Sequence, residues 1–211
     1  RSYFNSPFGE RIYFRNMNRN PLYPIFLKAH ELQFLIVGGG EVGLEKLTFL
    51  LKSSPDANVK LVSIEISGAI PKLLLNYPNH KVKLGKKAFD ETDLEGIDIV
   101  IAATNVRETN HEIRKIAKAK RILVNVADTP DLCDFYMGGI VTKGNLKVAI
   151  STNGKSPTFA KRFRQLLEET LPEDINSLLN NLRTIREKLK GDFNYKVTKL
   201  NEITADLIKA N

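Results

Sequence analysis

Three consecutive glycines follow a run of apolar residues near the front of this chain of 211 residues. The run extends from Phe34 to Val37, and a helix-like pattern follows the glycines at once, in the stretch FLIVGGGEVGLEK. Gly38, Gly40 and Gly43 have the spacing G-x-G-x-x-G, which lets a strand turn tightly into a helix while a pyrophosphate approaches the backbone. Free N–H groups at the start of such a helix bind the anion. Alone, this spacing is a weak indicator of a dinucleotide site.

The chain around this motif alternates between predicted strands and helices. Apolar runs of strand length are separated by segments with helical periodicity. We predict strands at 34–37, 59–64, 81–84, 97–103 and 121–126, and helices at 42–51, 66–75 and 108–119. Strands that alternate with helices at this spacing form a parallel sheet with crossover helices. The predicted fold class is therefore α/β, with a Rossmann-like parallel sheet.

The chain before the glycine motif has a different character. Residues 1–16 show no periodicity, and Met17 is a candidate natural start, so we expect 1–16 to be a leader that is either an upstream segment or foreign to the native protein. Pro21 to Leu27 is predicted to form an extended edge strand, because proline in a sheet is tolerated only at the edges.

The chain changes again after Pro130. Strand-like segments at 140–141 and 146–150 flank Lys143-Gly144-Asn145, a turn signal that predicts a hairpin. A basic helix is predicted from Pro157 to Leu171, followed by amphipathic helices over 175–189 and 195–209. We therefore predict a leader at 1–16, a dinucleotide-binding domain at 17–129, a small α+β dimerisation and substrate region at 130–171, and a helical C-terminal segment at 172–211.

Composition limits the classes of function. No apolar run approaches the roughly 20 residues of a membrane-spanning helix, so no membrane association is expected. A net charge of +8 favours an anionic partner, but the cations are spread out without an aromatic-basic stripe, so we expect a small polyanionic substrate or an inert basic surface and no nucleic acid. The single Cys133 favours the reducing cytoplasm, and we interpret it as a small buried hydrophobe and predict no bound metal.

An acidic residue strengthens the prediction of a dinucleotide site. Glu65 follows the second predicted strand, 22 residues after Gly43, where an acid can hold the hydroxyls of the adenosine ribose. No lysine or arginine lies within two residues of Glu65. NAD is therefore favoured over NADP, whose additional phosphate would be repelled. The alternative is that Glu65 is a solvated carboxylate at a strand end.

Two further strand ends carry polar residues, Thr104-Asn105 and Asp128. Ligands of open parallel sheets bind at the carboxyl ends of the strands. We therefore predict that Thr104 contacts the cofactor and that Asp128 orients a substrate or moves a proton. The alternative for Asp128 is a cap on the following turn, Thr129-Pro130-Asp131.

Four stretches together are far more specific than the glycine spacing: VGGGEVGLEK, IAATNVRETN, ILVNVADTPDLCDF and VAISTNGKSPTFAKRFR. In order and spacing they resemble the siroheme-synthase N-terminal module of the precorrin-2 dehydrogenase family, over about Pro21 to Pro172. The resemblance implies NAD-dependent oxidation of precorrin-2 to sirohydrochlorin, followed in some members by ferrous iron insertion, the sirohydrochlorin ferrochelatase reaction. It also implies a homodimer, in which the segment after the Rossmann-like domain mediates pairing and completes the active-site cleft.

The resemblance also implies roles for single positions. The aspartate of the family's N-V-x-D motif falls on Asp128, and we place Asn125 of the same motif among the substrate-binding residues. A serine near the substrate cleft falls on Thr152, where Asn153 replaces the first of two glycines. Met137-Gly138-Gly139 replaces the usual apolar-Pro-Ala sequence. The cofactor contacts fall on Glu41, Val42, Glu65 and Ile66.

Basic residues gather in the second region, namely Lys143, Lys147, Lys155, Lys161, Arg162 and Arg164. Because the tetrapyrrole carries acetate and propionate arms, we predict that Lys155, Lys161 and Arg164 bind substrate carboxylates. Lys161 and Arg164 lie three residues apart and share a helix face. The alternative is a solvated helix face.

Three functions stay open at this point. The chain is an NAD-dependent dehydrogenase with ferrochelatase activity, a dehydrogenase alone, or an NAD- or tetrapyrrole-binding regulatory protein without catalysis. Ferrous iron would be a substrate and needs no protein cage, because the four ring nitrogens supply its ligands. The presence of Asp128 disfavours the regulatory protein.

Overall fold

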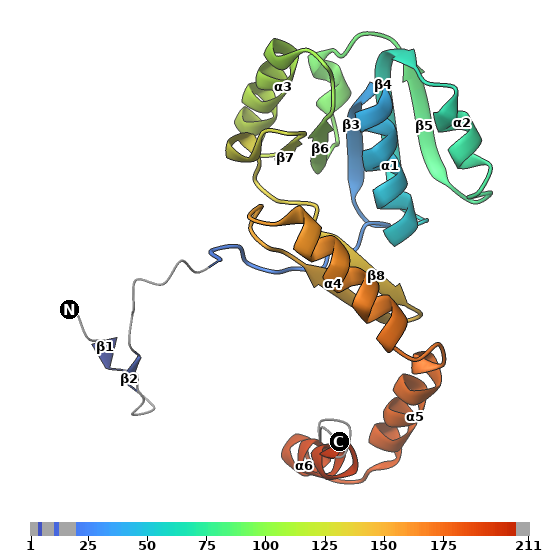
Figure 1. The fold of residues 1–211 in the computed structure, drawn as a ribbon, viewed down its shortest axis with the longest axis vertical. Coiled ribbons are helices and arrows are strands. Elements are labelled where there is room, and N and C mark those ends of the chain that lie inside the picture. Colours follow the sequence, from blue (N-terminus) through green and yellow to red (C-terminus); the bar gives the residue numbers. More distant parts are fainter. Residues whose placement is uncertain (1–3, 6–10, 13–19, 206–211) are drawn as a thin grey trace.

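A five-stranded parallel sheet forms the centre of residues 33–126 in the computed structural model, which describes residues 4–5, 11–12 and 20–205 (Figure 1). The strands lie in the order β5-β4-β3-β6-β7, so the chain reverses its direction of winding between β3 and β6. This arrangement confirms the predicted Rossmann-like α/β fold. The strands are β3 (Gln33–Gly39), β4 (Asn58–Ile66), β5 (Lys81–Lys86), β6 (Ile99–Ala102) and β7 (Leu123–Val126).

Helices cover both faces of the sheet (Figure 1). Side chains of α1 (Glu41–Ser53) and α2 (Ala69–Leu74) pack on the face that receives Phe34 and Ile36. The opposite face receives Leu35 and Val37 and is covered by α3 (Arg107–Ala119). Successive β3 residues thus enter two different cores, which explains why its sequence is apolar without alternation.

Two predictions about this part of the chain are wrong. Residues 20–28 pair with no strand, so the predicted edge strand at Pro21–Leu27 is absent. Pro21 and Pro24 offer no N–H group to a ladder, and Tyr23 is 87% exposed. The predicted helix at 66–75 begins later, at Ala69, because β4 continues to Ile66 and pairs there with Gly39 after a register shift.

Residues 139–205 form a separate arrangement next to one end of the sheet (Figure 1). As predicted, β8 (Gly139–Lys143) and β9 (Leu146–Ile150) form an antiparallel hairpin, and α4 (Pro157–Thr170) packs against β8. Two more helices, α5 (Ile175–Lys188) and α6 (Phe193–Ile203), follow. Asn176 anchors α5 to the hairpin tip by accepting the N–H of Asn145 at 2.7 Å.

The remaining elements are short. The 3-10 turns η1 (Glu91–Leu94) and η2 (Pro130–Leu132) join larger elements, and β1 (Phe4–Asn5) pairs with β2 (Arg11–Ile12). Most of the predicted leader, Met17 and the end of the predicted last helix fall outside the described residues. Among the helices described, none combines the length and apolar character needed to cross a bilayer.

Candidate active site

The glycine turn lies at the carboxyl end of β3, and its three motif glycines meet different surroundings. A Cβ on Gly38, whose φ is +118°, would lie 2.3 Å from the carbonyl oxygen of Ala103. A Cβ on Gly43 would lie 2.0 Å from the carbonyl oxygen of Gly38. By contrast, a Cβ on Gly40 would meet no atom within 4 Å. Two of the glycines are therefore required by close backbone packing, while Gly40 borders open space.

Gly40 is also the N-cap of α1, and no side chain caps this helix end. The first-turn residues Glu41 and Val42 therefore present backbone N–H groups next to the open face of Gly40. An uncapped helix N-terminus with a bare backbone beside it suits a pyrophosphate. The residues present at this turn thus fit the dinucleotide that the spacing predicts.

Glu65 and Ile66 lie beside the same turn, at the end of β4. Ser67 donates its N–H to the carbonyl oxygen of Gly39 at 2.9 Å, which holds the two strand ends together. The Glu65 side chain is exposed, and Ile66 is half-buried. The sheet register also brings Lys86 opposite Ser63, a neighbour that the local sequence around Glu65 did not reveal.

Thr104 follows β6 on the other side of the glycine turn. Its hydroxyl lies 2.7 Å from Oδ1 of Asn110 and also contacts the backbone of Val106. The side chain is therefore turned toward the protein, while Val106 is exposed. We did not single out Asn110 from the sequence, although it closes the IAATNVRETN stretch.

Asp128 occupies the turn after β7 in a left-handed conformation, with φ of +56°. This region is costly for most residues and is tolerated best by Gly, Asn and Asp. The carboxylate is exposed and makes no hydrogen bond with the described residues, and no side chain caps η2 from its N-cap, Thr129. The geometry gives no support to a capping role and leaves the carboxylate exposed just after the carboxyl end of β7.

Asn125 and Cys133 support this turn from inside. Asn125 is buried and donates from Nδ2 to the carbonyl oxygen of Phe135 at 2.9 Å, so the structure places it apart from the other predicted substrate-binding residues. The Sγ of Cys133 lies 3.2 Å from both the N and the O of Val126. Burial raises the pKa of the Cys133 thiol. No group of three metal-ligating side chains occurs in the part of the chain that the structure describes.

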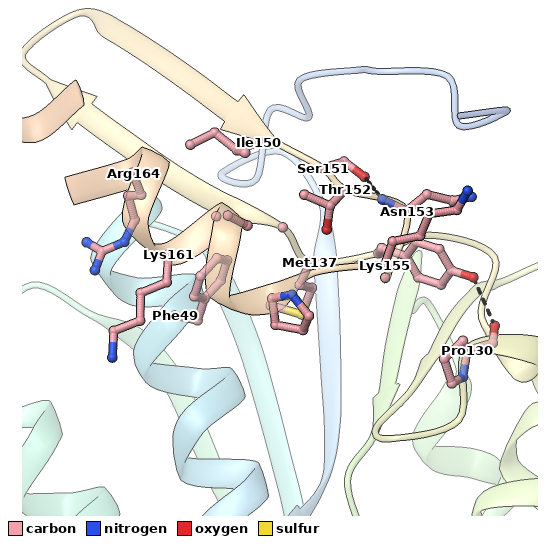
Figure 2. A pocket seen from close by; sticks show the side chains of 16 residues that line it. Phe49, Pro130, Met137, Ile150, Ser151, Thr152, Asn153, Lys155, Lys161 and Arg164 are labelled. Carbon is pink, nitrogen blue, oxygen red and sulfur yellow. Dashed lines mark hydrogen bonds between the residues drawn. The ribbon is translucent and has the colours of Figure 1, made fainter. Parts of the chain in front are cut away.

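A cavity of about 580 Å³ lies between the hairpin, α4 and the end of α1 (Figure 2). It unites four of the five predicted substrate-binding residues, and aromatic and apolar side chains such as Phe49 and Tyr136 form other parts of its wall. Pro130, which follows β7 and lies two residues after Asp128, also lines the cavity. The four predicted residues are Thr152, Lys155, Lys161 and Arg164.

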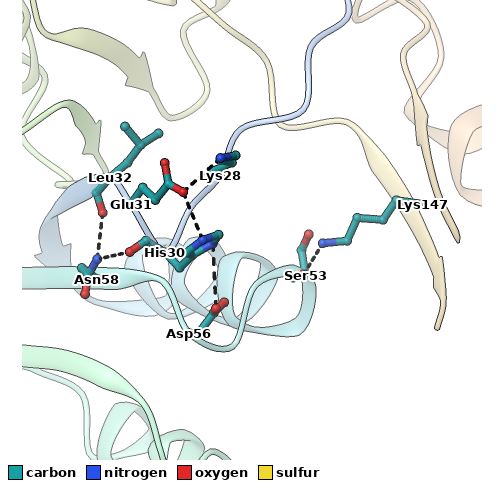
Figure 3. Close-up of polar contacts among 8 residues, drawn as sticks. All are labelled: Lys28, His30, Glu31, Leu32, Ser53, Asp56, Asn58 and Lys147. Atoms are coloured by element: carbon teal, nitrogen blue, oxygen red, sulfur yellow. Dashed lines mark hydrogen bonds and ion pairs between the residues drawn. The ribbon is translucent and has the colours of Figure 1, made fainter. Parts of the chain in front are cut away.

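The other basic residues of the second region have different partners. Lys143 pairs with Glu173, and Lys147 donates to the carbonyl oxygen of Ser53 at the end of α1 (Figure 3). Arg162 contacts Gln165 along α4. Lys143 and Lys147 therefore hold elements together, and Arg162 contacts a neighbour within its own helix. Of the cations that line the cavity, Arg164 also pairs with Glu168 at 2.6 Å.

The departures from the family pattern leave the backbone intact. Asn153 adopts φ of +53° and Gly154 adopts +73°, so Asn153 takes the left-handed conformation that a glycine would supply there. A Cβ on Gly138 would lie 2.3 Å from the carbonyl oxygen of Ile150. Gly138 thus permits close contact between the chain entering β8 and the end of β9.

The parallel sheet and the open glycine turn define the class of an NAD(P)-binding α/β protein. A family model described as "Putative NAD(P)-binding" matches residues 25–139, and one described as "Sirohaem biosynthesis protein central" matches residues 143–170. The chain therefore belongs to this NAD(P)-binding family and continues into the sirohaem central region. The resemblance to the siroheme-synthase N-terminal module is confirmed.

Individual relatives agree with this assignment. The siroheme synthase of Methylococcus capsulatus is 37% identical over 167 residues, which are 79% of this chain and 34% of that protein. The siroheme synthase of Pseudoalteromonas atlantica is 33% identical over 186 residues, which are 88% of this chain and 39% of that protein. The chain thus spans little more than a third of the length of these relatives. The solved structure of SirC, precorrin-2 dehydrogenase, has the same fold, with a TM-score of 0.69 at 24% identity, covering 88% of this chain and 90% of that one.

Proposed function

We propose that this chain is an NAD-dependent dehydrogenase that oxidises precorrin-2 to sirohydrochlorin in siroheme biosynthesis. The observation that carries the proposal is the uncapped start of α1 beside the open face of Gly40, at the strand ends where Asp128 also lies. A cavity lined by cations adjoins the C-terminal part of α1 and reaches Pro130, two residues after Asp128. Similarity to siroheme synthases supports the choice of a tetrapyrrole as the substrate.

The dinucleotide would be held by backbone and side-chain groups around the glycine turn. The N–H groups of Glu41 and Val42 would bind the pyrophosphate, and Glu65 would accept hydrogen bonds from the hydroxyls of the adenosine ribose. Nicotinamide, when bound, supplies the hydride acceptor that the oxidation requires. Glu65 favours NAD, while Lys86 on the neighbouring strand is the one observation that favours the phosphate of NADP.

The substrate carboxylates would be bound by Lys155, Lys161 and Arg164, because ammonium and guanidinium groups form charge-assisted hydrogen bonds with carboxylates. Thr152 would contact the macrocycle from the β9–α4 loop. Oxidation removes a hydride and a proton from precorrin-2, and the exposed carboxylate of Asp128 would orient the substrate or take up that proton.

A homodimer fits the second region. Phe159, Phe163 and Leu166 form a stripe on α4, and Phe159 and Leu166 are 59% and 55% exposed. The two phenyl rings stack with centroids 5.8 Å apart. We propose that a second copy covers this stripe, because α4 needs an apolar partner beyond the small hairpin. The single cysteine fits a cytoplasmic enzyme.

An anaerobic assay with precorrin-2 tests the function directly. Purified protein is mixed with precorrin-2 and either NAD⁺ or NADP⁺, and absorbance follows sirohydrochlorin formation. We expect turnover with NAD⁺ and at least tenfold less with NADP⁺. Ferrous iron is added afterwards, and formation of siroheme would assign chelation to the same protein. Binding of NAD⁺ without turnover would instead support the regulatory protein, and absence of binding would remove the proposed function.

A further inference from the structure

We propose that Asn110 is a positioning residue that fixes the loop receiving the nicotinamide half of the dinucleotide. The inference rests on the proposed function, because it deepens the description of the same cofactor site. It assigns a role to a buried side chain that touches neither the glycine turn nor the cavity.

The side-chain amide of Asn110 forms all its hydrogen bonds with one residue, Thr104. Its Oδ1 accepts from the hydroxyl of Thr104 at 2.7 Å and from the N–H of Thr104 at 3.3 Å, and its Nδ2 donates to the carbonyl oxygen of Thr104 at 3.0 Å. Asn110 is only 7% exposed. Each polar group of Thr104 thus has a partner on the same side chain, and the opposite amide orientation would set N–H against N–H.

The hydroxyl of Thr104 extends this network by one residue. It accepts the N–H of Val106 at 3.2 Å, while the carbonyl oxygen of Val106 lies 3.0 Å away and competes for the hydroxyl proton with Asn110. Val106 is the N-cap of α3 and has no side chain that could cap the helix. Asn110 and Thr104 therefore set the shape of the whole turn that leads from β6 into α3.

This turn forms a wall of the glycine site. Ala103 donates its N–H to the carbonyl oxygen of Val37 at 2.8 Å. A Cβ built on Gly38 would lie 2.3 Å from the carbonyl oxygen of Ala103 and 3.0 Å from the nitrogen of Thr104. The backbone held by Asn110 thus touches the first motif glycine, between β3 and β6, where the strand order reverses. Ligands of such sheets bind in this crevice.

The strand order indicates which half of the dinucleotide this wall would meet. The fold consists of two mononucleotide-binding halves, and Glu65, which suits the adenosine ribose, belongs to the half formed by β3, β4 and β5. The loop at Thr104 belongs to the other half, together with Asp128 after β7. Displacement of this loop should therefore weaken contacts to the nicotinamide end and spare the adenosine end.

Calorimetric titration of the full chain with NAD⁺ and, separately, with ADP tests this selectivity. For Asn110→Ala we expect the Kd for NAD⁺ to rise about tenfold, the effect of one net hydrogen bond lost, and the Kd for ADP to change less than twofold. Thr104→Val should give a smaller rise for NAD⁺, and Thr104→Ser should restore most of the affinity because it keeps the hydroxyl. The double variant should bind NAD⁺ no more weakly than Asn110→Ala, because both changes break one network.

Asn58→Ala provides the matched control. Asn58 also holds backbone carbonyls, those of His30 at 2.8 Å and Leu32 at 3.3 Å (Figure 3). It lies at the amino end of β4, whereas the glycine turn pairs with the carboxyl end of that strand. Its loss should lower the Tm while leaving both Kd values unchanged.

Several outcomes would overturn the proposal. Equal losses for NAD⁺ and ADP in Asn110→Ala would show a general structural role, and unchanged affinities would show no role in binding. Additive losses in the double variant would indicate direct contact of Thr104 with the cofactor. If Asn110→Ala does not fold, the comparison of Thr104→Val with Thr104→Ser replaces it. The measured quantity is again the rise in the Kd for NAD⁺ relative to the rise in the Kd for ADP. Failure of the unaltered chain to bind NAD⁺ or NADP⁺ would overturn the proposed function as well, so the two failures are distinguishable.

Discussion

The two regions of the molecule bury their apolar side chains to very different degrees. Residues 33–126 enclose a core on each face of the sheet, and β3 is buried along nearly its whole length. From residue 139 onward, Val141 and Ile150 are the apolar side chains that are buried among the described residues, and α4, α5 and α6 contribute none. The first region therefore has a core of its own, whereas the helices of the second region leave apolar side chains exposed, which the proposed dimer would cover.

The largest effect is expected in the self-contained region. Gly43→Ala would force a Cβ to within 2.0 Å of the carbonyl oxygen of Gly38, so we expect a loss of about 3 kcal/mol or more in the free energy of unfolding and no measurable NAD⁺ binding. Gly40→Ala is the matched control, since its Cβ meets open space. It should cost at most about 1 kcal/mol as a poorer N-cap, yet weaken NAD⁺ binding. Similar denaturation curves for the two variants would contradict this account.

Asp128 lies where the first region leads into the second, and its substitution tests whether its carboxylate takes part in the reaction. Asp128→Asn keeps the left-handed backbone accessible and removes the charge, so folding and NAD⁺ affinity should be unchanged while turnover falls about hundredfold. Asp131→Asn, three residues on, is the control and should leave turnover near normal. Steady-state kinetics that gave the unaltered rate for Asp128→Asn would exclude the carboxylate from the chemistry.

The exposed stripe on α4 tests whether a second copy of the chain covers the second region. Phe159→Ser with Leu166→Ser should raise the dimer dissociation constant by more than about a hundredfold, because each apolar side chain buried in an interface contributes about 1.5–3 kcal/mol. Sedimentation velocity measures this change. Serine at Leu75, an exposed apolar residue of the first region, is the control and should not affect assembly. A monomeric unaltered chain would show that the second region is stable without a partner.

Asp93 gives the first region a pH-dependent stability. It is 2% exposed and lies 2.8 Å from both Lys60 and Lys87. Burial raises the pKa of Asp93, but hydrogen bonds from Lys60, Lys87 and the N–H of Asp90 outweigh it and lower the pKa. Because the pKa of Asp93 is lower in the folded than in the unfolded protein, ionised Asp93 stabilises the fold at pH values above its unfolded-state pKa. This stabilisation disappears as the pH falls through the folded-state pKa.

Asp93→Asn should therefore lower the free energy of unfolding by about 2 kcal/mol at pH 7. The difference from the unaltered chain should shrink below about pH 4, where the unfolded carboxyl becomes protonated. Urea denaturation at several pH values measures the difference. A gap that stayed constant from pH 7 to pH 3 would count against the ion pairs.

The smallest effect is expected for the cations of the second region. Lys161→Gln or Arg164→Gln should raise the KM for precorrin-2 about tenfold each and leave the affinity for NAD⁺ unchanged. Lys143→Gln is the control, since Lys143 pairs with Glu173 instead of lining the cavity. Equal KM values for all three variants would assign the substrate carboxylates to other groups.

The glycine turn could be predicted from the sequence because its cause is local: Gly38 and Gly43 are needed wherever a strand turns this tightly into a helix. Other features depend on residues distant in the chain. Asn125 and Thr104 carry polar groups that suit a ligand, but the fold supplies Phe135 and Asn110 as internal partners. The spacing of apolar residues likewise could not show that Pro21–Leu27 finds no strand to pair with.

The α1 helix connects events at its two ends. It begins at the open face of Gly40, its side chain Phe49 lines the cavity, and the carbonyl oxygen of Ser53 near its last turn accepts a hydrogen bond from Lys147 of the hairpin. A helix transmits displacement along its axis as a rigid rod. If the hairpin tilted when the proposed substrate bound, either the Lys147 contact would break or α1 would move together with the glycine turn, which would couple occupancy of the two proposed sites.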